Sequence, residues 1–175
     1  FLRIRKGERF CMNTYSVRMK QVVEQFNLTV LHASTDYETV EIMVEEVSRP
    51  GLQVAGFFDH FEPLRLQVIG NVESAYISEL SHERLLEVFS EMFSKKIPAL
   101  IFARNIEPTP ECLEMAKKYD VTVLRCLEST SYIVSSLITY LKSALAPRIT
   151  RHGVLVEVYG EGLLLMGESG IGKSE

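Results

Sequence analysis

The run Pro98-Ala99-Leu100-Ile101-Phe102-Ala103 decides how this chain folds. It is apolar without interruption, which is typical of a strand that is covered on both faces, as in a parallel sheet. Neighbouring parallel strands need long crossover connections, which are usually helices. Helices are therefore expected on either side of this run.

Helix patterns flank the run on both sides. One covers residues 81–96, with a serine as its N-cap and apolar residues on one face. The triplet Thr109-Pro110-Glu111 starts another, because it places an N-cap, a proline and an acid in the order that a first turn favours. A third begins at Ser129 or Thr130 and ends before Pro147.

Predicted strands alternate with these helices. Residues 65–70 and 121–124 are expected to be strands, so strand and helix patterns alternate over residues 65–146. This alternation predicts an α/β fold with a largely parallel sheet, flanked by helices and joined by right-handed crossovers. We expect residues 15–146 to form this N-terminal α/β domain. Residues 1–14 show little pattern and are expected to be an irregular or non-native extension.

The first part of the domain gives weaker signals. Apolar residues at helical spacing predict a helix over residues 16–27. Residues 28–31 and 39–45 are predicted to be strands, the second with one wetter face. Arg49-Pro50-Gly51 indicates a turn.

Several chemically suggestive residues are interpreted as structural. Phe57, Phe58 and Phe61 are expected to pack rather than to stack on a ligand, because aromatic side chains at this density usually fill a core. Adjacent Asp59 and His60 are expected to lie at the surface. The three cysteines are widely spaced and odd in number, so we expect buried thiols, a reducing cytosol and no zinc cluster.

Composition narrows the class of protein. The chain has 175 residues, of which 46% are hydrophobic and 24% charged, as in ordinary globular domains. A net charge of −4 does not favour a nucleic-acid-binding surface. No apolar run approaches the ~18 residues that a membrane span needs. We therefore expect neither a nucleic-acid nor a membrane partner.

A second region begins after Pro147. Residues 149–158 alternate in polarity, and Tyr159-Gly160-Glu161-Gly162 resembles a hairpin connection. Residues 163–166 are predicted to form the second arm of the hairpin. We expect residues 147–175 to be the start of a second domain.

The hairpin leads into Gly167-Glu168-Ser169-Gly170-Ile171-Gly172-Lys173-Ser174, which fits the phosphate-loop pattern G-x-x-x-x-G-K-[ST]. The backbone N–H groups of such a loop surround a phosphate. Lys173 is expected at the β- and γ-phosphates, and the Ser174 hydroxyl on Mg²⁺. The alternative is a glycine-rich turn without a ligand.

Three further residues near the loop have two interpretations each. From spacing alone, His152 is interpreted as a strand histidine with a structural role, although a histidine near phosphates can also move a proton. Glu168 is expected to point outward from the loop. Glu175 is expected to cap the following helix or to support the metal from a distance.

Four stretches of the chain together resemble bacterial HPr(Ser) kinase/phosphorylase, from about residue 15 to residue 175. The loop alone is common to many nucleotide-binding proteins, so the other blocks make the resemblance specific. These stretches are His152-Gly153-Val154-Leu155-Val156 with Gly167 to Glu175, Ser48-Arg49-Pro50-Gly51-Leu52 with residues 55–59 and 65–70, Glu107-Pro108, and Leu145-Ala146-Pro147-Arg148.

The resemblance implies a function. The family phosphorylates a serine of HPr, the phosphocarrier of the sugar phosphotransferase system, using ATP or pyrophosphate with Mg²⁺. It also removes that phosphate by phosphorolysis with inorganic phosphate, and so regulates carbon metabolism. The resemblance further implies a cytoplasmic homo-hexamer built through the kinase domain, with His152 in the active site.

Two hypotheses follow for the chain itself. The first is the N-terminal part of this phosphotransferase, and the second is a non-catalytic α/β module for ligand sensing or assembly, in which the phosphate loop is an inactive stub. The sequence stops at Glu175, while the catalytic acids of the family are expected further along. We therefore expect these 175 residues alone to show no kinase or phosphorylase turnover.

Overall fold

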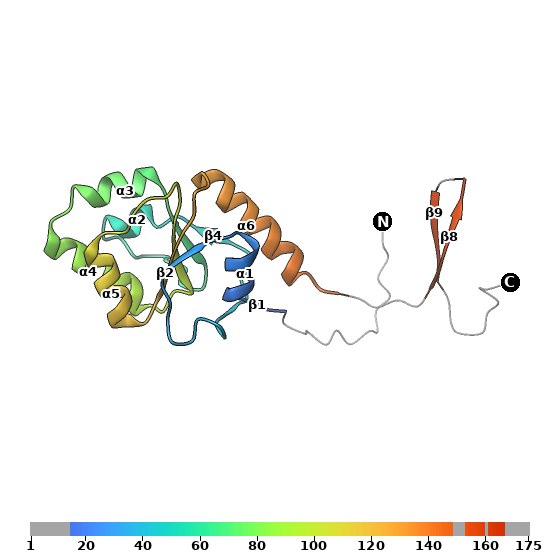
Figure 1. Ribbon diagram of the computed structural model, residues 1–175, viewed down its shortest axis with the longest axis horizontal. Coiled ribbons are helices and arrows are strands. Elements are labelled where there is room, and N and C mark those ends of the chain that lie inside the picture. Colours follow the sequence, from blue (N-terminus) through green and yellow to red (C-terminus); the bar gives the residue numbers. More distant parts are fainter. Residues whose placement is uncertain (1–14, 149–152, 160, 167–175) are drawn as a thin grey trace.

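The computed structural model describes residues 15–148, 153–159 and 161–166 (Figure 1). Residues 15–148 form an α/β domain around a five-stranded sheet with the order β2-β7-β6-β5-β4. The elements of this domain are β1 Val17–Arg18, α1 Met19–Gln25, β2 Thr29–His32, β3 Glu41–Ile42, β4 Val47–Ser48, α2 Gly51–Val54, β5 Leu66–Ile69, α3 Asn71–Ser78, α4 His82–Ser94, β6 Ala99–Phe102, α5 Pro110–Tyr119, β7 Thr122–Arg125 and α6 Thr130–Leu145.

The sheet is largely parallel, as the sequence predicts. Strands β4, β5, β6 and β7 lie side by side in parallel, with Val68 opposite Ile101 and Ile101 opposite Leu124. Strand β2 pairs antiparallel with β7 and forms one edge of the sheet. The quoted run of the sequence becomes β6, which has a neighbouring strand on each side.

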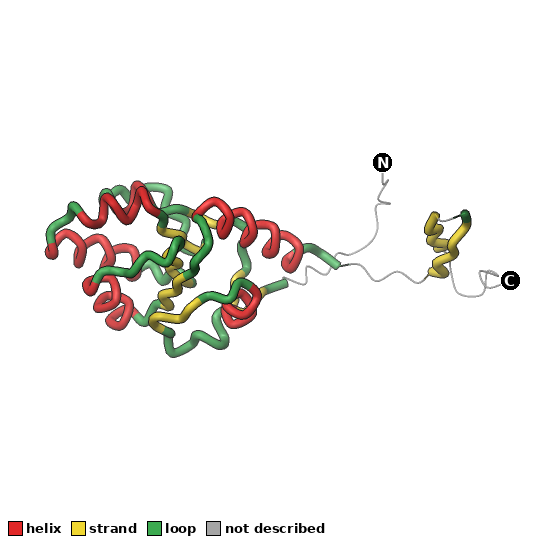
Figure 2. The backbone as a smooth tube through the Cα atoms, turned by 45° about the horizontal axis from the view of Figure 1, so that its top comes forward, coloured by secondary structure: helices red, strands yellow, loops and turns green. Residues whose placement is uncertain are grey.

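Two helical layers cover the sheet, as Figures 1 and 2 show from two directions. Helices α1 and α6 pack on one face with Ile101, and helices α2 to α5 pack on the other with Leu100. Successive residues of a strand point to opposite faces, so β6 contributes to both cores. This explains why its sequence is apolar throughout.

Side-chain caps begin the three long helices. The hydroxyl groups of Ser81, Thr109 and Ser129 each accept a hydrogen bond from a backbone N–H of the following turn, at 3.3 Å. The third helix therefore begins with Ser129 as its cap rather than with Thr130. Helix α5 ends at Asp120 in the left-handed conformation, with φ 55°.

The first part of the domain differs from expectation in three places. The strand predicted over residues 39–45 is wrong: a turn in which Asp36 accepts from Val40 leaves only Glu41–Ile42, which pair with β1. The turn at Arg49-Pro50-Gly51 opens a short helix, α2. Helix α3 was not predicted from the sequence. Its polar and apolar residues occupy the opposite sides from those of an ordinary amphipathic helix, because Glu73 is buried and Val72 is exposed.

Three structural interpretations are confirmed in the described part of the chain. Cys112 and Cys126 are buried free thiols, while Cys11 lies outside the described residues. Phe58 and Phe61 pack edge to face with ring centres 5.7 Å apart, although Phe57 is 49% exposed. Asp59 and His60 are exposed, as expected. None of the described helices is both long and apolar enough to cross a membrane.

After the α/β domain, β8 Gly153–Val158 and β9 Glu161–Met166 form an antiparallel hairpin. Val158 lies opposite Glu161, so β9 begins two residues before the predicted second arm, at Glu161. This confirms the predicted hairpin over the residues that the structure describes. Residues 149–152, at the start of the predicted strand, lie outside them.

Candidate functional site

The predicted phosphate loop follows β9 directly. Strand β9 ends at Met166, which confirms that a strand precedes the motif. The loop itself, Gly167 to Ser174 with Glu168, Lys173 and the other motif residues, lies outside the described residues, as do His152 and Glu175. Their predicted roles therefore stay predictions. The site geometry that the structure does describe belongs to the Arg-Pro-Gly block.

Arg49, the arginine of that block, forms an ion pair with a residue that the sequence analysis missed. It follows β4, and its Nη2 atom lies 2.8 Å from Oε1 and 2.9 Å from Oε2 of Glu73, in helix α3. The Glu73 side chain is only 6% exposed, whereas that of Arg49 is 44% exposed. The ion pair therefore ties the end of β4 to the first turn of α3.

Glu73 also caps its own helix. Its Oε2 accepts a hydrogen bond from the backbone N–H of Gly70, at 3.0 Å. A glutamate three residues after the N-cap is the second half of a capping box, so this spacing was a usable signal in the sequence. Arg49 and Gly70, which both lie in blocks that carry the family resemblance, thus meet at one buried carboxylate.

The environment keeps Glu73 ionised. Burial raises the pKa of its carboxyl group, because a charge is poorly solvated in the interior. Hydrogen bonds from Arg49 and from the backbone N–H groups of Glu73 and Gly70 outweigh burial, so the pKa lies below its ordinary value. The carboxylate is satisfied on every side that the structure describes, which fits a structural role.

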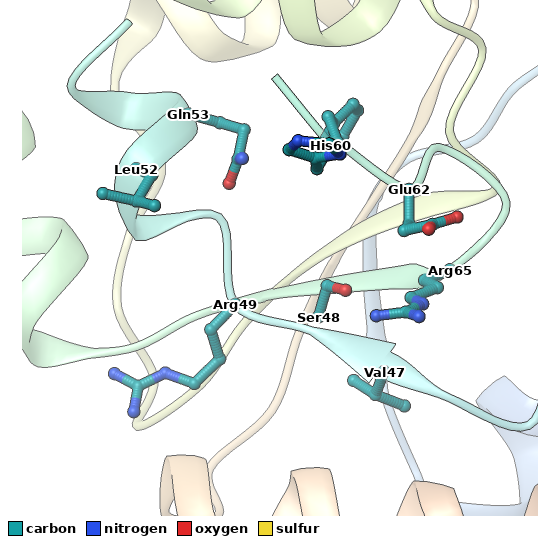
Figure 3. A pocket seen from close by; sticks show the side chains of 9 residues that line it. Val47, Ser48, Arg49, Leu52, Gln53, His60, Glu62 and Arg65 are labelled. Carbon is teal, nitrogen blue, oxygen red and sulfur yellow. The ribbon is translucent and has the colours of Figure 1, made fainter. Parts of the chain in front are cut away.

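A hollow of about 380 Å³ lies beside the same edge of the sheet (Figure 3). Ser48 and Gln53 point into the space between β4 and α2, whereas Arg49 and Val47 point to the other side of β4. The lining also includes Leu52, His60, Phe61, Glu62 and Arg65.

The chemistry of the hollow is limited. Arg65 already pairs with Glu46, an acid outside the hollow. The described residues contain no group of three or more His, Cys, Asp or Glu side chains placed to hold a metal ion. The hollow therefore offers polar contacts but, among the described residues, no ready-made metal site.

The comparisons with known proteins identify the family. A family model described as the HPr serine kinase N terminus matches residues 17–141. The chain belongs to the HPr serine kinase family. A second model, the HPr serine kinase C-terminal domain, matches residues 143–175. The resemblance carried by the Arg-Pro-Gly block and the phosphate loop is confirmed.

Similar sequences carry the name HPr kinase/phosphorylase. The protein of Lachnoclostridium phytofermentans is 44% identical over 161 residues, which are 92% of this chain and 52% of that protein. The protein of Caldicellulosiruptor bescii is 43% identical over 155 residues (89% and 50%). The protein of Streptococcus thermophilus is 40% identical over 160 residues (91% and 52%). The chain thus spans about half the length of these relatives.

Solved structures with a similar fold include the following one. It is the regulatory region, with CBS and DRTGG domains, of a Clostridium perfringens pyrophosphatase complexed with diadenosine tetraphosphate. The match has a TM-score of 0.50 at 14% identity and covers 73% of this chain and 50% of that one. At this identity the likeness concerns the fold alone.

Proposed function

We propose that the protein carrying this chain is an HPr kinase/phosphorylase, which transfers a phosphoryl group to a serine of HPr and removes it again. The observation that carries the proposal is the match of both family models to consecutive parts of one chain, residues 17–141 and 143–175. Relatives at 40% to 44% identity bear the same enzyme name. They support the enzyme over the non-catalytic module.

The proposed forward reaction uses ATP or pyrophosphate as donor. The hydroxyl oxygen of the HPr serine forms a bond to the terminal phosphorus of the donor, and the bond from that phosphorus to the leaving oxygen breaks. Bound Mg²⁺ supplies positive charge to the phosphate oxygens. Lys173 holds the phosphates, Ser174 offers its hydroxyl to the ion, and backbone N–H groups of Gly167 to Gly172 surround the β-phosphate.

The proposed reverse reaction is phosphorolysis. An oxygen of inorganic phosphate forms a bond to the phosphorus of phosphoserine, the bond to the serine oxygen breaks, and a proton returns to that oxygen. The products are pyrophosphate and unmodified HPr. We assign His152 to proton transfer or to a hydrogen bond with a phosphate oxygen in both directions.

The cellular location, the oligomeric state and the partners of the enzyme belong to the same proposal. A cytoplasmic homo-hexamer is proposed from the family resemblance. The proposed partners of the enzyme are HPr and inorganic phosphate. We propose no nucleic-acid partner and no membrane partner. The expectation that residues 1–175 alone show no turnover remains a prediction.

The phosphate loop is tested by replacing its lysine. In the protein that carries this chain, Lys173→Ala should lower the rate of HPr serine phosphorylation by at least about 100-fold, because a loop lysine stabilises charge on the transferred phosphoryl group. Phosphoserine formation is measured with labelled ATP. Lys142→Ala, at an exposed position of α6, is the matched control and should retain the full rate. A Lys173→Ala variant as fast as this control would refute the proposed function.

A further inference from the structure

Gln67, in strand β5, is a buried polar residue with an unused hydrogen-bond acceptor. Its side chain is 0% exposed. The Nε2 atom donates to the carbonyl oxygens of Glu62, at 3.2 Å, and of Arg65, at 3.0 Å. The Oε1 atom is buried and has no hydrogen-bond partner among the described residues. Buried polar atoms without a partner are rare in folded proteins, so this oxygen needs an explanation, and a bound molecule is one.

The Gln67 side chain is aimed at the hollow of Figure 3 from below. Ser48 of β4 lies opposite Gln67 in the parallel pair, and residues paired in this way point to the same face of the sheet. The Ser48 side chain points into the hollow. Glu62 and Arg65, whose carbonyl oxygens accept from Gln67, line the same hollow. The unused acceptor therefore lies beneath this hollow.

The charges around the hollow favour an uncharged ligand. Arg49 is paired with Glu73 and points to the other side of β4. Arg65 is paired with Glu46. Both arginines are thus already neutralised, while the exposed acid Glu62 remains in the lining. A phosphate or carboxylate group would be repelled by Glu62, and a cation would lie beside the guanidinium group of Arg65.

The polar groups of the hollow favour a ligand with several hydroxyl groups. The Oε1 atom of Gln67 and the carboxylate of Glu62 only accept hydrogen bonds, so the ligand has to donate to both. The amide of Gln53 and the hydroxyl of Ser48, which also line the hollow, can both donate and accept. A hydroxyl group matches all four partners, because it donates one hydrogen bond and accepts two.

The hollow also has an aromatic side chain that is held in place. Phe61 lines it and packs edge to face on Phe58, with ring centres 5.7 Å apart. The Nζ atom of Lys95, from the start of the α4–β6 connection, lies 5.4 Å from the centre of the Phe58 ring. A ring that is fixed in advance loses little freedom when a ligand binds. Its electron-rich face suits the C–H groups on one face of a sugar ring.

We propose that this hollow binds an uncharged monocyclic sugar or polyol. Its hydroxyl groups donate to Glu62 and to the buried Gln67 and exchange hydrogen bonds with Gln53, while its C–H face lies against Phe61. The volume of about 380 Å³ suits one such ring, because ligand pockets begin at about 300 Å³. The site goes beyond the proposed phosphotransferase function, since it lies in the N-terminal α/β domain and takes no phosphate.

NMR titration of the ¹⁵N-labelled 175-residue chain tests the site, with D-glucose, D-mannose, D-ribose and myo-inositol as probes. At least one probe should shift the amide signals of residues 47–53 and 60–65, with a Kd of about 1 mM, as expected for so small a ligand. Gln53→Ala should weaken this binding by at least about tenfold, because it removes a hydrogen-bonding amide. Gln25→Ala is the matched control, since Gln25 is exposed at the end of α1 on the opposite face of the sheet, and it should bind unchanged.

The buried acceptor and the absence of charge on the ligand are tested separately. Gln67→Leu should weaken binding by at least about tenfold, and circular dichroism checks that this variant folds. Ser48→Ala leaves Gln67 in place, so its expected loss of about threefold or more tests the site even where Gln67→Leu fails to fold. The phosphate ester of the bound probe should bind more weakly than the probe itself. No shift with any probe, binding that Gln53→Ala or a folded Gln67→Leu leaves intact, or tighter binding of the phosphate ester or of adenosine would each overturn the proposal.

Discussion

Glu73 joins the start of α3 to the Arg-Pro-Gly block. Its buried carboxylate accepts hydrogen bonds from Arg49 in the β4–α2 connection and from the backbone of Gly70. Glu73→Gln should lower the free energy of unfolding by about 2 kcal/mol, because a neutral amide loses the charge-assisted hydrogen bond from a partly exposed Arg49. Urea denaturation near neutral pH measures this, with Glu79→Gln at the exposed end of α3 as the control.

The same variant predicts a pH dependence. The pKa of Glu73 is lower in the folded state than in the unfolded state, so the carboxylate stabilises the fold above its ordinary pKa. That contribution disappears as the pH falls through the folded-state value. The stability difference between the natural protein and Glu73→Gln should therefore shrink between about pH 7 and about pH 3. A constant difference over this range would contradict the assigned ionisation.

At the scale of the secondary-structure elements, the close contact between the starts of α3 and α6 requires that residue 70 has no side chain. A Cβ there would lie 2.4 Å from Oγ1 and 2.9 Å from Cγ2 of Thr130. Gly70→Ala should destabilise the domain by about 2 kcal/mol, as overpacking of a core does. Thr130→Ala removes both atoms, so the double variant should recover part of the loss. Gly51→Ala is the control, because its Cβ would meet only Glu73 Oε1 at 3.8 Å.

Helices α4 and α5 are joined at their starts by His82 and Glu111. Nδ1 of His82 lies 2.7 Å from Oε1 of Glu111, and this hydrogen bond raises the pKa of His82 and lowers that of Glu111. A raised histidine pKa means that the link stabilises the fold at acidic pH and is lost as the pH rises through the folded-state pKa. NMR titration of His82 should show a raised pKa that returns towards about 6.5 in Glu111→Gln. An unchanged titration in that variant would contradict the link.

At the scale of the whole molecule, the protection of backbone amides against hydrogen exchange should decrease from the central strand of the sheet to its edges. Strand β6 has a strand on each side, and all four of its residues are at most 2% exposed. Strands β2 and β4 are the two edges of the sheet. Amide hydrogen exchange at Leu100 and Ile101 should therefore be slower than at Thr29 or Val30, because core strands open only with the whole domain. Equal rates across the sheet would show that it does not unfold in this order.

The central part of the fold could be predicted from the sequence because its signals are local. An uninterrupted apolar run marked β6, shorter and partly polar runs marked β5 and β7, and the caps at Ser81, Thr109 and Ser129 marked the long helices. Helix α3 was missed because the burial of Glu73 depends on Arg49, which lies 24 residues away. The hydrogen bond between Val40 and Asp36 similarly shortened β3, which the alternating pattern alone had extended.

The candidate site could also be predicted only where its residues are close together in the sequence. The phosphate loop is a contiguous motif, so its chemistry could be predicted without a structure. The network of Arg49, Gly70 and Glu73 joins two separate segments, and only the spacing of Gly70 and Glu73 indicates part of it. The contact between the start of α3 and the start of α6, Gly70 against Thr130, is likewise encoded by no local pattern.

The position of β2 at the edge of the sheet has a consequence during protein synthesis. Strands β4 to β7 stand next to one another in the order in which they are made, so each finds its neighbour already present. Strand β2 emerges before all of them, but its partner is β7, which ends at Arg125. At ribosomal rates of about 5–20 residues per second, residues 29–32 wait roughly 5–20 s for that partner. The first strand of the sheet to leave the ribosome is therefore the last to be paired.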